Sequence, residues 1–149
     1  MQAIRFTPFD LSAAARVQHF ETCNRTAASQ RVADIVEALR AEPGAILVAA
    51  GDEAVAGALA SALEPPRLAI LDMTGFDTTR DEDYLARSYI PGLRRAGDLR
   101  TASELAQGRL VFHNTGAGFT ATEARVERRP LAPAEVLRLV RESSAGRRR

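Results

Sequence analysis

Two short runs of apolar residues constrain the fold of this chain more than any other feature. Residues 45–50 (AILVAA) and 67–73 (RLAILDM) show no alternation of apolar and polar side chains. Strands of this kind are buried on both faces, as in parallel sheets that helices cover on each side. A turn at 51–53 and a helix of small residues at 54–63 separate them, and two prolines close the helix. The sequence therefore predicts a βαβ unit with a right-handed crossover.

The rest of the pattern extends this unit. A helix capped by Asn24 or Thr26 is expected to run to about residue 41, because its apolar residues repeat at helical spacing. The further elements expected are a weak strand at 4–7, a helix near 11–19, a loop at 74–83, helical pieces within 84–106, a strand at 110–113, an edge strand at 124–128 and a closing helix from Pro133.

Together these elements predict an α/β fold of three layers, with a mostly parallel sheet of about four to five strands. A chain of 149 residues fits one domain, which we place at 1–142. Residues 143–149, which end in three arginines, are expected to form a disordered tail. Because aromatic residues make up only 5% and Trp is absent, the core must be built from Ala, Leu, Val and Ile.

Charge and cysteine content narrow the function classes. The formal net charge is +1 and all basic residues are arginine, so no general attraction to nucleic acid or membrane is expected. Cys23, the only cysteine, cannot form an internal disulfide, which favours a reducing, cytoplasmic location. No run approaches the roughly 18 apolar residues that a membrane span needs.

Polar residues gather where the predicted strands end. Open α/β sheets bind ligands beyond the carboxyl ends of their strands. This rule selects five candidate ligand-binding residues, Gly51, Asp52, Thr74, Asn114 and Thr115. The alternative is that they are simply polar loop residues.

Three titratable residues at the same strand ends are candidates for catalysis. Glu53 falls where a nucleophile elbow of the G-x-S-x-G type would place its serine, if Gly51 is the first glycine. Asp72 could act as a general acid or base, and His113 could hydrogen-bond a ligand. Structural roles are open for each: a charge at a helix N-terminus for Glu53, a loop cap for Asp72 and a buried structural ring for His113.

The histidine positions argue against a hydrolase triad. In this fold the catalytic histidine comes late in the chain, but no histidine follows His113 and the other, His19, precedes every confident strand. No Cys/His cluster with metal spacing, dinucleotide fingerprint or phosphate loop is present, so neither a metal nor an organic cofactor is expected.

Five short stretches resemble one family in the same order. They are residues 24–35 (NRTAASQRVADI), 51–54 (GDEA), 71–76 (LDMTGF), 89–93 (YIPGL) and 110–116 (LVFHNTG). This series resembles the acetyl-xylan-esterase-like α/β-hydrolases, in which a glutamate already stands in for the elbow serine. Val55 replaces a family glycine, and Arg94 and Arg95 replace a Lys-Tyr pair.

The resemblance implies the C-terminal half of an α/β-hydrolase core whose nucleophile has been replaced. We therefore expect a degenerate, non-catalytic domain that binds a partner or a small, carbohydrate-derived ligand at the strand ends. An exposed sheet edge predicts a homodimer or a companion chain. The alternatives are an esterase-like hydrolase using Glu53, Asp72 and His113, and a purely structural domain.

Overall fold

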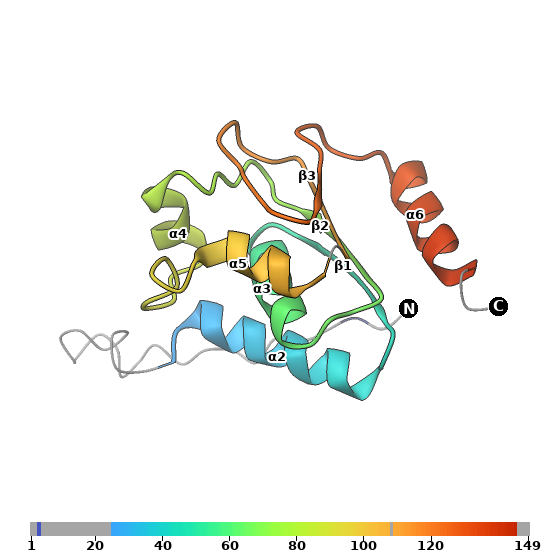
Figure 1. The fold of residues 1–149 in the computed structure, drawn as a ribbon, viewed down its shortest axis with the longest axis horizontal. Coiled ribbons are helices and arrows are strands. Elements are labelled where there is room, and N and C mark those ends of the chain that lie inside the picture. Colours follow the sequence, from blue (N-terminus) through green and yellow to red (C-terminus); the bar gives the residue numbers. More distant parts are fainter. Residues whose placement is uncertain (1–2, 4–24, 108, 146–149) are drawn as a thin grey trace.

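In the residues that the structure describes, five helices surround one four-stranded sheet (Figure 1). The computed structural model describes Ala3 and residues 25–107 and 109–145. In chain order the elements are α2 (Ala27–Ala41), β1 (Ile46–Ala50), α3 (Asp52–Leu63), β2 (Leu68–Asp72), α4 (Asp81–Arg87), α5 (Asp98–Leu105), β3 (Leu110–His113), β4 (Arg125–Val126) and α6 (Pro133–Ala145).

The sheet has the order β1-β2-β3-β4, and every neighbouring pair is parallel. In the first pair Ile46 lies opposite Leu68 and Ala50 opposite Asp72. The two apolar runs are therefore neighbouring parallel strands, which confirms the predicted βαβ unit. The register also sets Asp72 opposite His113, so that β2 and β3 end side by side.

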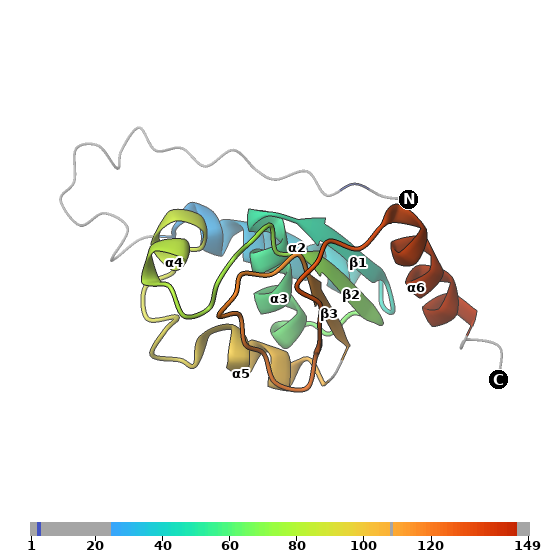
Figure 2. The same cartoon turned by 90° about the horizontal axis from the view of Figure 1, so that it is seen from above.

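Helices cover both faces of the sheet, which confirms the three-layer α/β prediction (Figure 2). On one face α2, α3 and α5 enclose the main core, in which Ile35, Val55 and Leu99 pack with Leu71 and Phe112. On the other face α6 lies alone over a smaller cluster formed by Ile70, Val111 and Leu131.

The small residues of α3 let it lie at the centre of the main layer. Eight consecutive residues of this helix are buried, from Ala54 to Ser61. A Cβ atom on Gly57 would lie 3.1 Å from Leu47 and 3.2 Å from Leu71, so the missing side chain permits close approach to β1 and β2. Helix α3, which is rich in Ala, thus packs closely between the sheet and α2.

Three boundaries differ from the predictions. Helix α3 begins at Asp52, two residues before the predicted start. Helix α4 begins at Asp81, inside the predicted loop, since three acidic residues at its first turn favour a helix N-terminus. Helix α6 continues to Ala145, so the tail predicted from residue 143 starts too early.

Some expectations lie outside the described residues. These are the strand at 4–7, the helix near 11–19, the N-cap Asn24 and residues 146–149 of the tail. Thr26 is the N-cap of α2, as predicted, and its hydroxyl accepts a hydrogen bond from the N–H of Ser29. Across the part of the chain that the structure describes, no helix combines the length and apolar character needed to cross a bilayer.

Candidate functional site at the strand ends

Gly51 occupies the sharp turn between β1 and α3. Its backbone angles are φ 68° and ψ −133°, a region that strains residues with a side chain. Its N–H donates to the carbonyl of Asp72 at 2.9 Å, and its own carbonyl accepts from Ala54 at 3.1 Å. In a nucleophile elbow the strained turn residue carries the nucleophile. Here that residue has no side chain, so the predicted placement of Glu53 at the serine position is wrong.

Asp52 and Glu53 instead form the first turn of α3 and pair with different helices. Glu53 lies 3.6 Å from the Nε of Arg31 on α2, whereas Asp52 lies 3.0 Å from the Nε of Arg87 on α4. Negative charge in a helix's first turn is stabilising by roughly 0.3–1 kcal/mol. The two acids therefore favour the start of α3 and tie it to its neighbours.

The Asp72 carboxylate organises the ends of β2 and β3. Its Oδ1 accepts hydrogen bonds from the N–H of Thr74 at 2.9 Å, the Thr74 hydroxyl at 3.2 Å and the Asn114 amide at 2.7 Å. Thr74 and Asn114 both have positive φ, 47° and 54°. The carboxylate thus holds two strained turn residues in place, which is the loop-capping role that the sequence left open.

His113 is buried beside this carboxylate but does not donate to it through Nδ1. Its ring is 5% exposed, and Nδ1 lies 4.0 Å from the Asp72 Oδ2. The Nδ1 atom accepts a hydrogen bond from the N–H of Leu131 at 3.2 Å, so a neutral ring carries its proton on Nε2. Burial lowers the pKa of His113 below its usual value of 6.5. The negative charges of Asp72 and Glu135 raise this pKa, but their effect is smaller than that of burial.

Arg87 is a central residue of the site that the sequence did not single out. From α4 its Nε donates to Asp52, while Nη1 and Nη2 donate to the carbonyls of Thr74 and Met73 at 3.2 and 3.1 Å. Its guanidinium also lies 5.3 Å from the centroid of the Phe76 ring. Arg87 therefore connects the N-terminus of α3 to the end of β2 through hydrogen bonds.

Asp77 forms a second polar centre in the loop after β2. Its Oδ1 accepts from the N–H and hydroxyl of Thr79 at 2.9 and 2.6 Å, and its Oδ2 accepts from the N–H of Gly118 at 2.6 Å. The Thr79 hydroxyl is the largest cause that lowers the Asp77 pKa below 3.8. A Cβ on Gly116 would lie 2.7 Å from that of Asp77, so the glycine permits the contact.

The sequence contained a signal for this second centre. An aspartate two residues before a threonine is typical of an Asx turn, and two glycines at 116 and 118 permit close backbone approach. Thr115 is 9% exposed, and its buried hydroxyl has no hydrogen-bond partner in the part of the chain that the structure describes.

The predicted site residues therefore fall into two groups. Hydrogen bonds and register bring together Asp72, Thr74, His113 and Asn114, and Arg87 links Asp52 to them. Glu53 faces Arg31 instead and shares no described interaction with Asp72 or His113. The three candidate catalytic side chains do not form one constellation.

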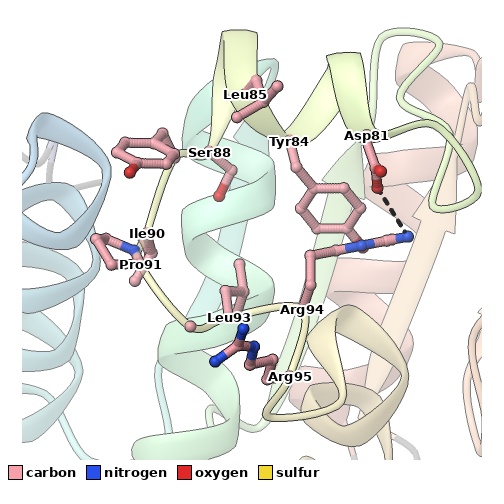
Figure 3. A pocket seen from close by; sticks show the side chains of 11 residues that line it. Asp81, Tyr84, Leu85, Ser88, Ile90, Pro91, Leu93, Arg94 and Arg95 are labelled. Carbon is pink, nitrogen blue, oxygen red and sulfur yellow. Dashed lines mark ion pairs between the residues drawn. The ribbon is translucent and has the colours of Figure 1, made fainter. Parts of the chain in front are cut away.

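A pocket of about 720 Å³ lies between α4 and the segment that leads to α5 (Figure 3). Arg94 spans one wall, where it pairs with Asp81 at 3.0 Å and lies 4.6 Å from the centroid of the Tyr84 ring. None of the eight predicted site residues lines it. The lining residues are Asp81, Tyr84, Leu85, Ser88, Tyr89, Ile90, Pro91, Gly92, Leu93, Arg94 and Arg95.

Neither a metal centre nor a known relative assigns an activity to this arrangement. Within the described ranges, no three His, Cys, Asp or Glu side chains gather so that they could hold a metal ion. The chain matches no protein-family model, no curated protein and no solved structure.

Proposed function

We propose that this chain is a degenerate, non-catalytic α/β-hydrolase-like domain that binds a partner or a small ligand where its parallel strands end. One observation carries this proposal: the groups that catalysis would need are already engaged in holding the backbone. Gly51 leaves the strained turn without a side chain, and an Asp72 oxygen accepts three hydrogen bonds.

The state of His113 supports the same conclusion. In a Ser-His-Asp triad the histidine donates its Nδ1–H to the carboxylate and uses Nε2 as the base. Here the Nδ1 lone pair accepts the Leu131 N–H, so the Nε2 of the neutral ring is protonated and cannot accept a proton. Catalysis would require breaking this buried hydrogen bond.

Hydrolysis of 4-nitrophenyl acetate tests the absence of catalysis. We expect the wild type to be no faster than the Asp72→Asn and His113→Asn proteins, each checked for folding by circular dichroism. Wild-type turnover that both substitutions lower by about tenfold or more would contradict the proposal, because removing a general base typically costs about 10²–10⁴-fold.

The alternative function is an esterase-like hydrolase with a non-standard constellation. The 4.0 Å separation of His113 Nδ1 and Asp72 Oδ2 favours it, since a rotated ring could donate to the carboxylate. The Glu53→Gln protein distinguishes this enzyme from the non-catalytic domain. Turnover that this change abolishes would favour the enzyme, whereas equal or absent turnover in both proteins would eliminate Glu53 as a nucleophile.

For the ligand, the resemblance to acetyl-xylan-esterase-like proteins suggests a carbohydrate. Asn114 and Asp52 are two of the partly buried polar side chains at the strand ends that such a ligand would meet. Titration of xylobiose into the ¹⁵N-labelled protein should shift the amide resonances of residues 51–53 and 113–115. Shifts elsewhere, or none at saturating sugar, would argue for a partner chain instead.

For the partner, the free edge of β1 is the proposed contact. The N–H of Gly51 and the carbonyl of Ala45 both bond toward β2, so the backbone groups of Ile46, Val48 and Ala50 face away from it. No strand of the described chain lies on that side. Unpaired edges of this kind are templates for pairing with another strand, from a second copy or from a companion chain.

A further inference from the structure

The pocket between α4 and the segment that leads to α5 combines an apolar wall with polar groups that have no partner among the described residues. Leu85, Ile90 and Leu93 supply aliphatic surface from three points around it (Figure 3). A volume of about 720 Å³ is within the range of sites that hold small organic molecules, about 300–1,000 Å³. Its residues are separate from Asp72 and His113, so its use does not depend on whether the strand ends are catalytic.

One hydroxyl group of this pocket faces its interior and has no protein partner among the described residues. Ser88 is 3% exposed, points into the pocket, and forms no side-chain hydrogen bond with any described residue (Figure 3). A carboxylate oxygen of a ligand would accept the hydrogen bond that the Ser88 hydroxyl can donate.

The charges of the pocket indicate the sign of the ligand. Arg94 is occupied, because it pairs with Asp81 and Asp98 and donates to the carbonyl of Thr78. The neighbouring Arg95 has no carboxylate partner in the described part of the chain. One unpaired guanidinium beside an aliphatic wall fits a single negative charge on an apolar molecule, and guanidinium matches the planar carboxylate.

We propose that this pocket binds a small aliphatic monocarboxylate, with its carboxylate on Arg95 and Ser88 and its hydrocarbon chain against Leu85, Ile90 and Leu93. This site was not expected from the sequence, and it is separate from the strand-end site proposed above. The same groups would not favour a neutral molecule, which leaves Arg95 unpaired, or a small inorganic anion, which leaves the apolar wall exposed.

The protein carries its own reporter for this site. It contains two tyrosines and no tryptophan, and both tyrosines, Tyr84 and Tyr89, line the pocket. Titration with hexanoate should therefore change the intrinsic tyrosine fluorescence saturably, and calorimetry should give the same affinity. Hexanamide, which has the same chain without the charge, and inorganic phosphate should each bind at least about tenfold more weakly.

Two substitutions that each remove one positive charge complete the test. Arg95→Gln should weaken hexanoate binding by about tenfold or more, since one charge-assisted contact is lost. Arg141→Gln removes an exposed arginine from α6, away from the pocket, and should leave the affinity unchanged. The proposal is overturned if hexanoate gives no saturable change, if hexanamide or phosphate binds as well, or if both variants bind like the wild type.

Discussion

At the scale of single residues, buried or half-buried carboxylates organise the strand ends by accepting hydrogen bonds from turn residues. Asp72 accepts from Thr74 and Asn114, and Asp77 accepts from Thr79 and Gly118. Each carboxylate joins a loop after β2 to the loop after β3, through contacts about forty residues apart in the chain. The polar residues that suggested a ligand site therefore also stabilise the fold.

His113 gives this structural role a pH dependence. Because burial lowers its pKa in the folded protein below 6.5, the unfolded chain binds the proton more readily. The free energy of unfolding should be at its full value above about pH 6.5 and should fall as the pH is lowered below it. Urea unfolding between about pH 7.5 and pH 5.5 measures this slope.

The control for this prediction is His113→Asn, whose Oδ1 can replace the ring Nδ1 as acceptor for the Leu131 N–H. This variant should lose the part of the slope that belongs to His113, while His19 is present in both proteins. Equal slopes in the two proteins would mean that His113 is not buried in its neutral form.

The sequence located part of this site and missed part of it, for physical reasons. Asp72 and Asn114 were correctly placed at the carboxyl ends of strands, because the apolar runs that precede them predicted those strands. Arg87 and the pocket could not be foreseen, since they depend on how α4 packs against the end of β2. Glu53 was misplaced because the strained residue of the turn is Gly51, a backbone feature that one sequence does not show.

At the scale of elements, α3 shows why periodicity located the strands and helices but not all of their ends. Its small residues, between two apolar strands, made the βαβ unit predictable. The start at Asp52 was missed because acidic residues after Gly51 are compatible with either a turn or a first helical turn. Helix α4 was missed at its start for the same reason.

The buried position of α3 predicts that it tolerates no added volume. Ala58 is 0% exposed inside a helix surrounded by the sheet, α2 and α5. Ala58→Leu adds three carbon atoms to this packed region and should lower the free energy of unfolding by about 1–3 kcal/mol. Denaturation in urea measures the change.

A matched substitution in the same helix provides the comparison. Leu63 is 64% exposed at the end of α3, so Leu63→Ala should change the free energy of unfolding by no more than about 0.5 kcal/mol. If Ala58→Leu proved equally harmless, α3 would not be packed as tightly against its neighbours as the structure indicates.

At the scale of the whole molecule, the two edge strands of the sheet differ in how well they are protected from pairing with another strand. The edge at β4 is only two residues long, and an arginine precedes its valine. The edge at β1 is five residues long, Ile46–Ala50, and contains no charged residue or proline. Natural sheets blunt such edges with charge, proline or a covering segment, so an apolar edge of this length is expected to be paired.

A two-fold axis through Val48 would pair β1 with the same strand of a second copy, antiparallel, with Ile46 opposite Ala50 of the partner. We therefore expect the wild type to be a dimer by size-exclusion chromatography with light scattering. Val48→Lys should make it monomeric without unfolding it, since this side chain is 55% exposed and a lysine on an edge strand opposes pairing. Leu137→Lys on α6, where the side chain is also 55% exposed, introduces the same charge away from the edge and should leave the dimer intact. A monomeric wild type, or a dimer that survives Val48→Lys but not Leu137→Lys, would show that this edge is not where two copies meet.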